Sequence, residues 1–434
     1  MKVLHITASD HGGAGRAAHR LHLSMRAAGI DSHMCAFDKR SGDMWTTRIR
    51  ALAGIFVLRR FLSKVILKVL TIPDYRFSWQ DISLGISAES FCAQLGMSPD
   101  IIVVHYISGF LSFQDVLQLQ RLTNARVIWN LLDMGGFTGG CHYAWSCHGY
   151  EAKCGRCPAL RMRSESDLSA RVLERKRRTI SAMDLTVVAG STLLRDQARN
   201  SIVFGDRQIN TILIGIDPET FRQRNREEAR RLLGLSTDKR TIFFGAQSSK
   251  DRRKGHMWLV KALQQLAEMT DFDHSSVQIL SIGKVDDSPE LAAAGIIQNH
   301  LGLTDDESQL VLAYQASDVL ACPSVQDSGP TMINESLMCG TPVVAFHMGV
   351  ATDLICGGQT GYIARLMDTN EFAAGLRRFL ELDENERTVV SDRCRNLAFE
   401  RCNAAVQAQK YVTVMKKLCE GNVDSSNVAT NEVD

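Results

Sequence analysis

Two carboxylates eight positions apart, Asp327 and Glu335, have the clearest chemical purpose in this sequence. They lie in the segment 323–346, where we expect a loop, a helix and a second strand after a first strand at 319–322. Loop amides and a helix N-terminus bind phosphate oxygens. Glu335, one turn into the helix, can accept hydrogen bonds from the paired hydroxyls of a ribose. The segment therefore predicts a nucleotide-sugar site, with phosphate-binding amides from Gly329, Thr331 and Met332. The alternative is a solvated pair of acids that the helix dipole stabilises.

The segment resembles the hallmark of the retaining glycosyltransferases of family four, which have the GT-B fold. That hallmark is two acids separated by seven residues, followed here by Cys-Gly-Thr-Pro-Val-Val-Ala. Asp327 takes the first acidic position, where glutamate is commoner, and Glu335 takes the second. The resemblance implies that Glu335 binds the ribose and Asp327 the hydroxyls of the donor sugar. It also implies retention at the anomeric carbon, with the departing phosphate oxygen as the base.

A basic loop, Lys-Asp-Arg-Arg-Lys-Gly, ends at Gly255. A leaving nucleoside diphosphate carries charge that a metal or basic groups must neutralise. Lys254-Gly255 is similar to the Lys-Gly of family four, whose lysine contacts the diphosphate. Ala246 stands where that family has an arginine, and we expect Arg252 or Arg253 to compensate. Catalysis should then need no metal. A solvated basic loop is the alternative.

A glycine-rich turn, Gly12-Gly13-Ala14-Gly15, follows the first expected strand, and Asp38 ends the next one. Gly13 to Ala18 fits G-x-G-x-x-A, which alone suggests an NAD-dependent dehydrogenase with Asp38 on the ribose. A tight turn without a ligand also fits. In family four, the amides of this loop, here Gly13 and Gly15, approach the donor phosphates and the acceptor. The acids at 327 and 335 favour glycosyl transfer, because a dehydrogenase has no use for them.

Four cysteines lie within seventeen positions, one pair spaced Cys-x-x-Cys; they are Cys141, Cys147, Cys154 and Cys157. Such a cluster predicts a structural zinc site. Buried thiols and a redox pair are the alternatives.

The sequence Phe-Thr-Gly-Gly-Cys-His at 137–142 resembles a bacterial subgroup of family four that makes exopolysaccharide, including colanic-acid-type enzymes. That subgroup usually has a histidine where Leu132 stands here, and a tryptophan at the position of Gly135 or Gly136. We expect Asp133 and His105 to line the acceptor side of the cleft, with Asp133 as a fallback base. A histidine at a strand end is as often a satisfied core residue.

Strand and helix signals alternate nearly from end to end, which predicts an α/β protein with parallel sheets. With the resemblance, this implies two doubly wound Rossmann-like domains facing a central cleft. The expected parts are an acceptor-side domain (1–215), a nucleotide-sugar domain (216–395), a helix returning to the first domain (396–420) and a disordered tail (421–434). Within them we expect a last strand of the first domain at 212–214 and a long helical region at about 371–419.

The composition describes a globular protein of 434 residues, 45% hydrophobic, with a net charge of +2. That charge is too small to indicate nucleic acid. Lys2–Thr7 reads as a strand rather than a leader, and twelve cysteines suggest reduced thiols, so we expect a cytoplasmic protein. No apolar run is long enough to cross a bilayer. Within an insertion at about 48–72, residues 55–70 predict a basic amphipathic helix. It either lies on the anionic inner face of the membrane or packs on its own domain.

Together these features predict a glycosyltransferase. It would move a hexosyl group from a UDP- or GDP-sugar to a glycan or lipid-linked acceptor, with retention, in bacterial cell-surface polysaccharide synthesis. A dehydrogenase and a non-catalytic relative acting as a scaffold are the alternatives.

Overall fold

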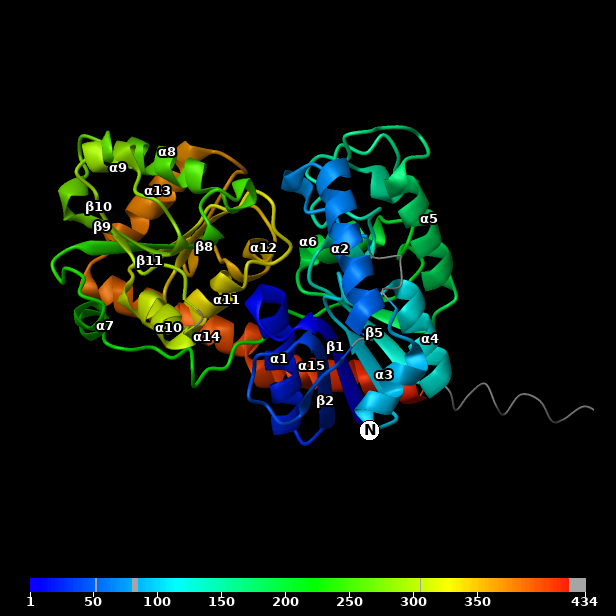
Figure 1. Cartoon of the computed structure of the whole chain (residues 1–434). Coiled ribbons are helices and arrows are strands. Elements are labelled where there is room, and N and C mark those ends of the chain that lie inside the picture. Colours follow the sequence, from blue (N-terminus) through cyan, green and yellow to red (C-terminus); the bar gives the residue numbers. More distant parts are fainter. Residues whose placement is uncertain (51–52, 80–84, 305, 421–434) are drawn as a thin grey trace, which may run out of the picture.

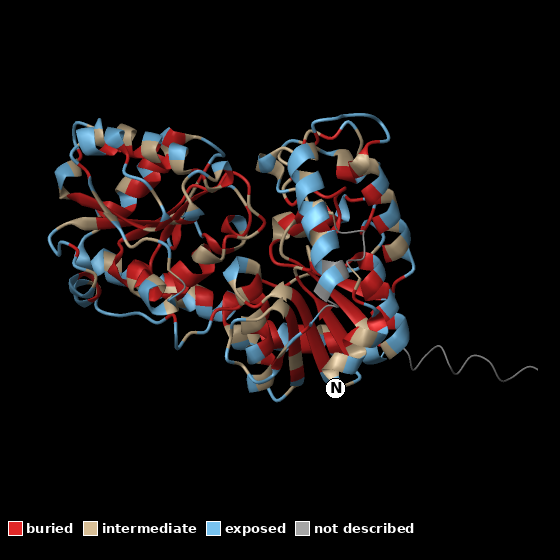
Figure 2. Cartoon of the chain, in the orientation of Figure 1, coloured by how far each residue is buried: buried red, intermediate tan, exposed pale blue. Residues whose placement is uncertain are grey.

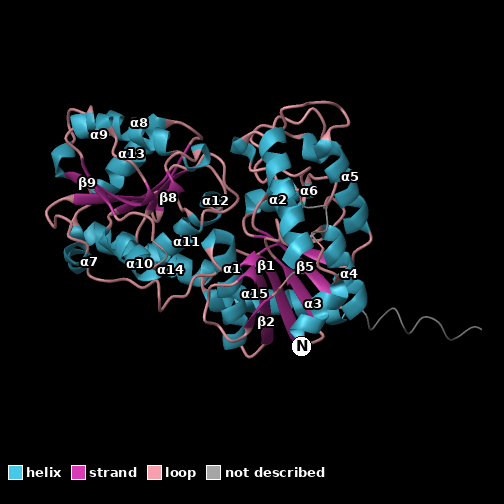
Figure 3. Cartoon of the chain, in the orientation of Figure 1, coloured by secondary structure: helices cyan, strands magenta, loops and turns pink. Residues whose placement is uncertain are grey.

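The computed structural model describes residues 1–50, 53–79, 85–304 and 306–420. Two parallel sheets form two lobes, each with helices on both faces (Figure 1, Figure 3). The predicted α/β architecture with two doubly wound domains is confirmed. The tail predicted at 421–434 lies outside the described residues, as do positions 51–52 of the insertion.

The first sheet has seven strands in the order β3-β2-β1-β4-β5-β6-β7. Their bounds are β1 Lys2–Ser9, β2 Asp31–Asp38, β3 Thr46–Arg48, β4 Ile101–Val104, β5 Arg126–Leu131, β6 Leu185–Ala189 and β7 Ile209–Thr211. The helices of this half are α1 Gly12–Ala27, α2 Ala53–Leu70, α3 Ala88–Leu95, α4 Phe113–Thr123, α5 Leu168–Ser181 and α6 Thr192–Arg199, with short 3₁₀ turns at Pro73–Tyr75, Met134–Gly136 and Gly149–Glu151.

The second sheet has six strands in the order β10-β9-β8-β11-β12-β13. Their bounds are β8 Arg240–Ser248, β9 Val277–Lys284, β10 Ile297–His300, β11 Val319–Cys322, β12 Val343–Phe346 and β13 Gly361–Ala364. The helices are α7 Arg226–Leu232, α8 His256–Ala267, α9 Pro289–Ala293, α10 Glu307–Ala316, α11 Thr331–Met338, α12 Ala351–Leu354, α13 Thr369–Leu380, α14 Glu384–Cys402 and α15 Ala404–Glu420, with 3₁₀ turns at Arg252–Lys254 and His274–Ser276.

In each sheet, successive strands along the chain are added first toward one edge and then toward the other. This reversal falls between β1 and β4 in the first sheet and between β8 and β11 in the second. The central strands are apolar on both faces, and β4, β11 and β12 are buried over their whole length. In open parallel sheets, ligands bind outside the carboxyl ends of the strands at such a reversal. The loops after β8 and β11 carry the basic loop and Asp327, so the fold brings these segments together.

The long helical region expected at 371–419 is three helices. Asn403, between α14 and α15, has an extended backbone, and Ile216 pairs with the chain on both sides of it. Helix α15 then packs on the first sheet, where Tyr411 and Met415 share a core with Val3. Figure 1 shows α15 beside α1 and β1, in the lobe where the chain begins.

The strand expected at 212–214 was wrong, because the edge strand β7 ends at Thr211. The apolar residues that suggested it are buried for another reason. Ile212 belongs to the core of the first domain, whereas Leu213 belongs to the core of the second. The apolar residues at 212–213 therefore lie where the chain passes from the core of the first domain to the core of the second.

Helix α2 is confirmed as a helix, but it does not pack its apolar side on its own domain. Seven of its large apolar side chains are exposed, with Phe61 62% exposed, and no residue of α2 whose burial is described is buried. Figure 2 shows the helix almost entirely in the colour of exposed residues. Among the described residues, no helix is both long and apolar enough to span a membrane.

Candidate active site

The loop after β8 is shaped by Gly255. Its φ of 73° is left-handed, and a Cβ there would lie 1.8 Å from the carbonyl oxygen of Pro323, in the loop after β11. Only glycine permits this approach. The two loops therefore touch through backbone atoms, which places the basic loop directly beside the acidic segment.

Asp327 lies within this contact. Its Oδ2 accepts a hydrogen bond of 2.6 Å from Lys254 Nζ, and Arg253 Nη1 is 3.9 Å away. Burial alone would raise the pKa of Asp327, but Lys254 and then Arg253 lower it below its usual value. The two cations thus lie together at the first carboxylate of the acidic segment.

Arg252 does not join this cluster. Its guanidinium donates a 2.6 Å hydrogen bond to Asp74 of the first domain, and Arg76 similarly reaches Asp251. Of the two arginines expected to compensate for the missing family arginine, Arg253 is therefore the one beside Asp327. Arg252 instead links the domains.

The amides proposed for phosphate stand at the start of α11. Pro330 is the N-cap and supplies no side-chain cap, while Gly329 N donates to Asp327 Oδ1 at 3.3 Å. Thr331 and Met332 are the first two helical residues. The first N–H groups of a helix have no intrahelical partner, so these amides are open to a ligand.

Glu335 follows one turn later and is held from two sides. Its Oε2 accepts a 2.8 Å hydrogen bond from Tyr314 OH, and its Oε1 accepts one of 2.8 Å from Arg20. Arg20 belongs to α1, in the first domain. Although Glu335 is buried, it therefore lies at the contact between the two domains.

Tyr143 connects the first domain to Asp327. The guanidinium of Arg253 lies 3.9 Å from the centre of its ring. Burial, followed by the nearby Asp327 carboxylate, raises the pKa of Tyr143, and Asp133 adds to this effect. One carboxylate from each domain therefore acts on the same tyrosine hydroxyl.

On the first-domain side, His105 and Asp133 line one small cavity of about 20 Å³. His105 is a core residue, since both ring nitrogens are in hydrogen bonds, to His5 and to Asn130. Burial lowers its pKa to about 3, so it is neutral near pH 7. Asp133 instead pairs with His142 Nδ1 at 2.8 Å. A Cβ at Gly135 would lie 2.8 Å from that nitrogen, and one at Gly136 would lie 2.7 Å from Leu131, so neither position has room for a larger side chain here.

The glycine turn forms part of α1 rather than a loop before it. Gly13 and Gly15 lie in the first turn of the helix. A Cβ at Gly15 would lie 2.5 Å from the carbonyl oxygen of Ser9, so this glycine serves the packing of α1 on the end of β1. Asp38, the ribose ligand expected of a dehydrogenase, pairs with His11 at 2.9 Å. The site gives no support to the dehydrogenase alternative.

One small apolar cavity, which Asp327 does not line, is lined by all four cysteines, Cys141, Cys147, Cys154 and Cys157. All are free thiols, and burial raises the pKa of Cys154 to about 12. In residues 1–50, 53–79, 85–304 and 306–420, no group of three or more histidine, cysteine, aspartate or glutamate side chains is arranged to hold a metal ion. Burial favours protonated thiols while no metal is bound, and coordination to zinc would deprotonate them, so the zinc site stays a prediction.

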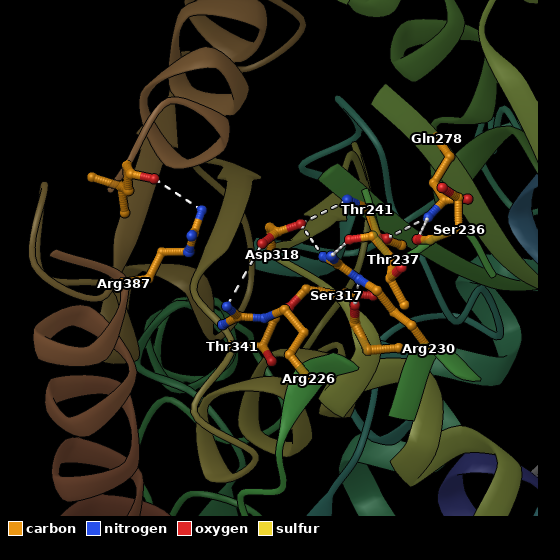
Figure 4. Close-up of polar contacts among 12 residues, drawn as sticks. Arg226, Arg230, Ser236, Thr237, Thr241, Gln278, Ser317, Asp318, Thr341 and Arg387 are labelled. Carbon is orange, nitrogen blue, oxygen red and sulfur yellow. Dashed lines mark hydrogen bonds and ion pairs between the residues drawn. The ribbon is translucent and has the colours of Figure 1, made fainter. Parts of the chain in front are cut away.

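A buried ionic network fixes the two strands that carry the site (Figure 4). Asp318, just before β11, accepts hydrogen bonds from Arg230 Nη2 at 2.5 Å and from the amide of Thr241 in β8 at 2.7 Å. Arg230 also donates to the carbonyl oxygens of Ala316 and Thr237. This network ties α7 to the β8–β11 reversal.

The sequence did not predict three residues that reach this site from other segments. Arg20 and Tyr314 contact Glu335, and Tyr143 lies near Asp327. Arg20 and Glu335 are 315 positions apart. No local spacing indicates such a pair. The one available signal was that Arg20 lies two helical turns after Gly13, which puts it on the same side of α1 as the glycine turn.

Residues 238–382 match the family model of glycosyl transferases group 1. Among curated relatives, a D-inositol 3-phosphate glycosyltransferase of Corynebacterium jeikeium is 27% identical over 195 residues, covering 42% of this chain and 46% of the relative. A putative colanic acid biosynthesis glycosyl transferase, WcaC of Escherichia coli, is 27% identical over 242 residues, covering 54% and 55%. The chain thus spans about half the length of the curated relatives it matches.

Solved structures resemble nearly the whole chain in fold. A sucrose-phosphate synthase from Thermosynechococcus elongatus has a TM-score of 0.66 at 17% identity, covering 97% of this chain and all of the other. Anabaena HepE in complex with UDP has a TM-score of 0.60 at 15% identity, covering 96% and 100%. The chain therefore has the GT-B fold, and its second domain matches the group 1 glycosyltransferases.

Proposed function

We propose that this protein transfers a hexosyl group from a nucleoside-diphosphate sugar to a glycan or lipid-linked acceptor, with retention. The observation that carries the proposal is the contact of Asp327 with Lys254 and Arg253 at the start of α11, followed by Glu335. It lies in the segment that matches the group 1 family model. The WcaC relative, whose name refers to colanic acid, supports a role in exopolysaccharide synthesis.

In this proposal each residue has one task. Glu335 accepts hydrogen bonds from the ribose, and Asp327 from hydroxyls of the donor sugar. Lys254 and Arg253 stabilise the diphosphate as the bond between the anomeric carbon and the phosphate oxygen breaks. The acceptor oxygen bonds to the same face of that carbon, and its proton passes to the departing phosphate oxygen. No separate protein base is then required.

We expect UDP or GDP to stabilise the protein and NAD not to. A ligand at about 100 times its Kd raises the free energy of unfolding by about 2.7 kcal/mol, which thermal unfolding detects. UDP is the first probe, because Anabaena HepE was solved with UDP and with UDP-glucose. A panel of UDP- and GDP-sugars then tests for slow hydrolysis. Stabilisation by NAD alone would overturn the proposal, whereas nucleotide binding with no turnover of any donor would support the scaffold.

We propose further that α2 binds the anionic inner face of the membrane from the cytoplasmic side. Its exposed surface combines apolar side chains such as Phe61 and Val65 with the exposed cations Arg59, Lys64 and Lys68, and the helix has no acidic residue. Apolar burial together with attraction to anionic lipids is what holds a helix in the membrane interface. From α2 the chain runs directly to Asp74 and Arg76, which contact the second domain.

Replacing Phe61 and Val65 with aspartate should reduce binding to phosphatidylglycerol-containing vesicles by about tenfold or more, because each buried apolar side chain contributes roughly 1.5–3 kcal/mol. Co-sedimentation measures this, with phosphatidylcholine vesicles as the neutral surface. Leu122→Asp is the matched control, since Leu122 is an exposed leucine on α4. Equal binding by all variants would refute the membrane role. Concentration-dependent dimers that the double variant abolishes would instead assign α2 to self-association.

A further inference from the structure

The Glu335 carboxylate is contacted from both domains at once. Arg20 Nη1, from α1, lies 2.8 Å from Oε1, and Tyr314 OH, from α10, lies 2.8 Å from Oε2. The carboxylate is only 5% exposed. Burying a carboxylate is costly unless a cation and hydrogen bonds compensate for the lost water. Here the first domain supplies the cation.

The Arg20 guanidinium is itself fixed. Its second nitrogen forms an ion pair with Glu307 at the start of α10, and the group lies 5.0 Å from the ring centre of Phe221. Burial alone would lower the pKa of Arg20, but Glu335 and Glu307 raise it above its usual value. All three contacts are with the second domain. Arg20 therefore holds α1 of the first domain against the second domain.

The geometry leaves Glu335 able to accept more hydrogen bonds. Each carboxylate oxygen has two lone pairs. Arg20 uses one on Oε1 and Tyr314 uses one on Oε2, so one on each oxygen remains. Two neighbouring ribose hydroxyls donate two hydrogen bonds in parallel, which matches a carboxylate whose plane is already set by two fixed donors.

We propose that Arg20 is a positioning residue of the donor site, which orients Glu335 for the two ribose hydroxyls. Because Arg20 belongs to the first domain, recognition of the ribose then depends on the contact between the domains. This inference rests on the proposed function, in which Glu335 is the ribose ligand. It adds a residue from the opposite domain to a site otherwise built by the second.

The test compares the affinities of UDP and 2′-deoxy-UDP by calorimetry, with GDP and 2′-deoxy-GDP if the wild type prefers guanine. The wild type should prefer the ribonucleotide. Arg20→Ala should lower UDP affinity by about tenfold. This is the usual worth of one charge-assisted hydrogen bond, here the one that a misoriented Glu335 would no longer accept from a ribose hydroxyl. It should also bring the ratio of the UDP and 2′-deoxy-UDP affinities close to one. Glu335→Gln should have the same effect on this ratio. Loss of stability alone would weaken both nucleotides equally and leave the ratio unchanged.

Glu307→Gln is the matched control, because it removes the other ion pair of Arg20 and keeps the contact with Glu335. It should preserve the ribose preference, and the double variant Arg20→Ala/Glu335→Gln should bind UDP no more weakly than Glu335→Gln. Two results for Arg20→Ala would overturn the role of Arg20. One is an unchanged ratio of the UDP and 2′-deoxy-UDP affinities. The other is tighter UDP binding, which would mean that Arg20 competes with the ribose for Glu335. If the wild type binds no nucleoside diphosphate, the proposed function fails, and this inference fails with it.

Discussion

Replacing Lys254 with alanine is expected to lower the turnover of the donor sugar by about 10²–10³-fold, which is the usual effect of removing one preorganised donor from developing negative charge. Lys254 Nζ lies 2.6 Å from Asp327, beside Arg253 and the start of α11, where the diphosphate would lie. Arg253 would remain and supply part of the charge. The measurement is the rate of nucleoside diphosphate release from the donor that the wild type uses.

The matched control is Lys250→Ala in the same loop. Lys250 is 83% exposed and pairs only loosely with Asp286, at 3.6 Å. Its loss should change the rate less than twofold, because exposed charges contribute little. Lys254→Arg should restore part of the activity, since it keeps the charge while changing its shape. Equal losses in the Lys250 and Lys254 variants would show that the basic loop acts only through its general charge.

The parts of the site that could be predicted are those encoded within short segments. Asp327, Glu335 and the start of α11 lie within nine consecutive positions, so the expected loop and helix and the resemblance to the family hallmark were enough to relate them. Lys254 could be placed only by its resemblance to a known Lys-Gly pair. The structure adds the physical reason, namely the backbone contact between Gly255 and Pro323.

The partners that complete the site could not be predicted, because they come from elements that only the fold brings together. Arg20 reaches Glu335 from the other domain, and Tyr143 meets Arg253 from a loop more than a hundred positions away. The same limit applied to the cysteines. Their spacing suits zinc, yet spacing does not fix where the four sulfur atoms point.

Helix α2 shows how a pattern can predict an element without its surroundings. Its apolar spacing indicated a helix over residues 55–70, and the structure has one at Ala53–Leu70. The same spacing fits a helix that packs on its domain and one that rests on a lipid surface. The exposure of residues such as Phe61 and Val69 argues against packing on the domain, and the lipid surface is our proposal.

Asp318→Asn is expected to destabilise the second domain by about 3–5 kcal/mol, the usual cost of removing one partner from a buried ion pair. Asp318 is fully buried, and it is the carboxylate that compensates Arg230, which is itself only 5% exposed. Burial lowers the pKa of Arg230, and Asp318 only partly offsets that effect. Without this carboxylate, the guanidinium would stay buried with carbonyl oxygens alone. The measurement is urea denaturation, followed by tryptophan fluorescence, to which Trp258 in α8 contributes from the second domain.

Two further variants show whether the loss comes from the uncompensated charge. Asp271→Asn removes an exposed ion pair with Arg377 in the same domain and should have a much smaller effect. Arg230→Met/Asp318→Leu removes both charges and should recover part of the stability, because an apolar pair of similar volume carries no desolvation cost. A double variant as unstable as Asp318→Asn would contradict the charge argument. The loss would then come from the hydrogen bond between Asp318 and the amide of Thr241, which joins β8 to β11.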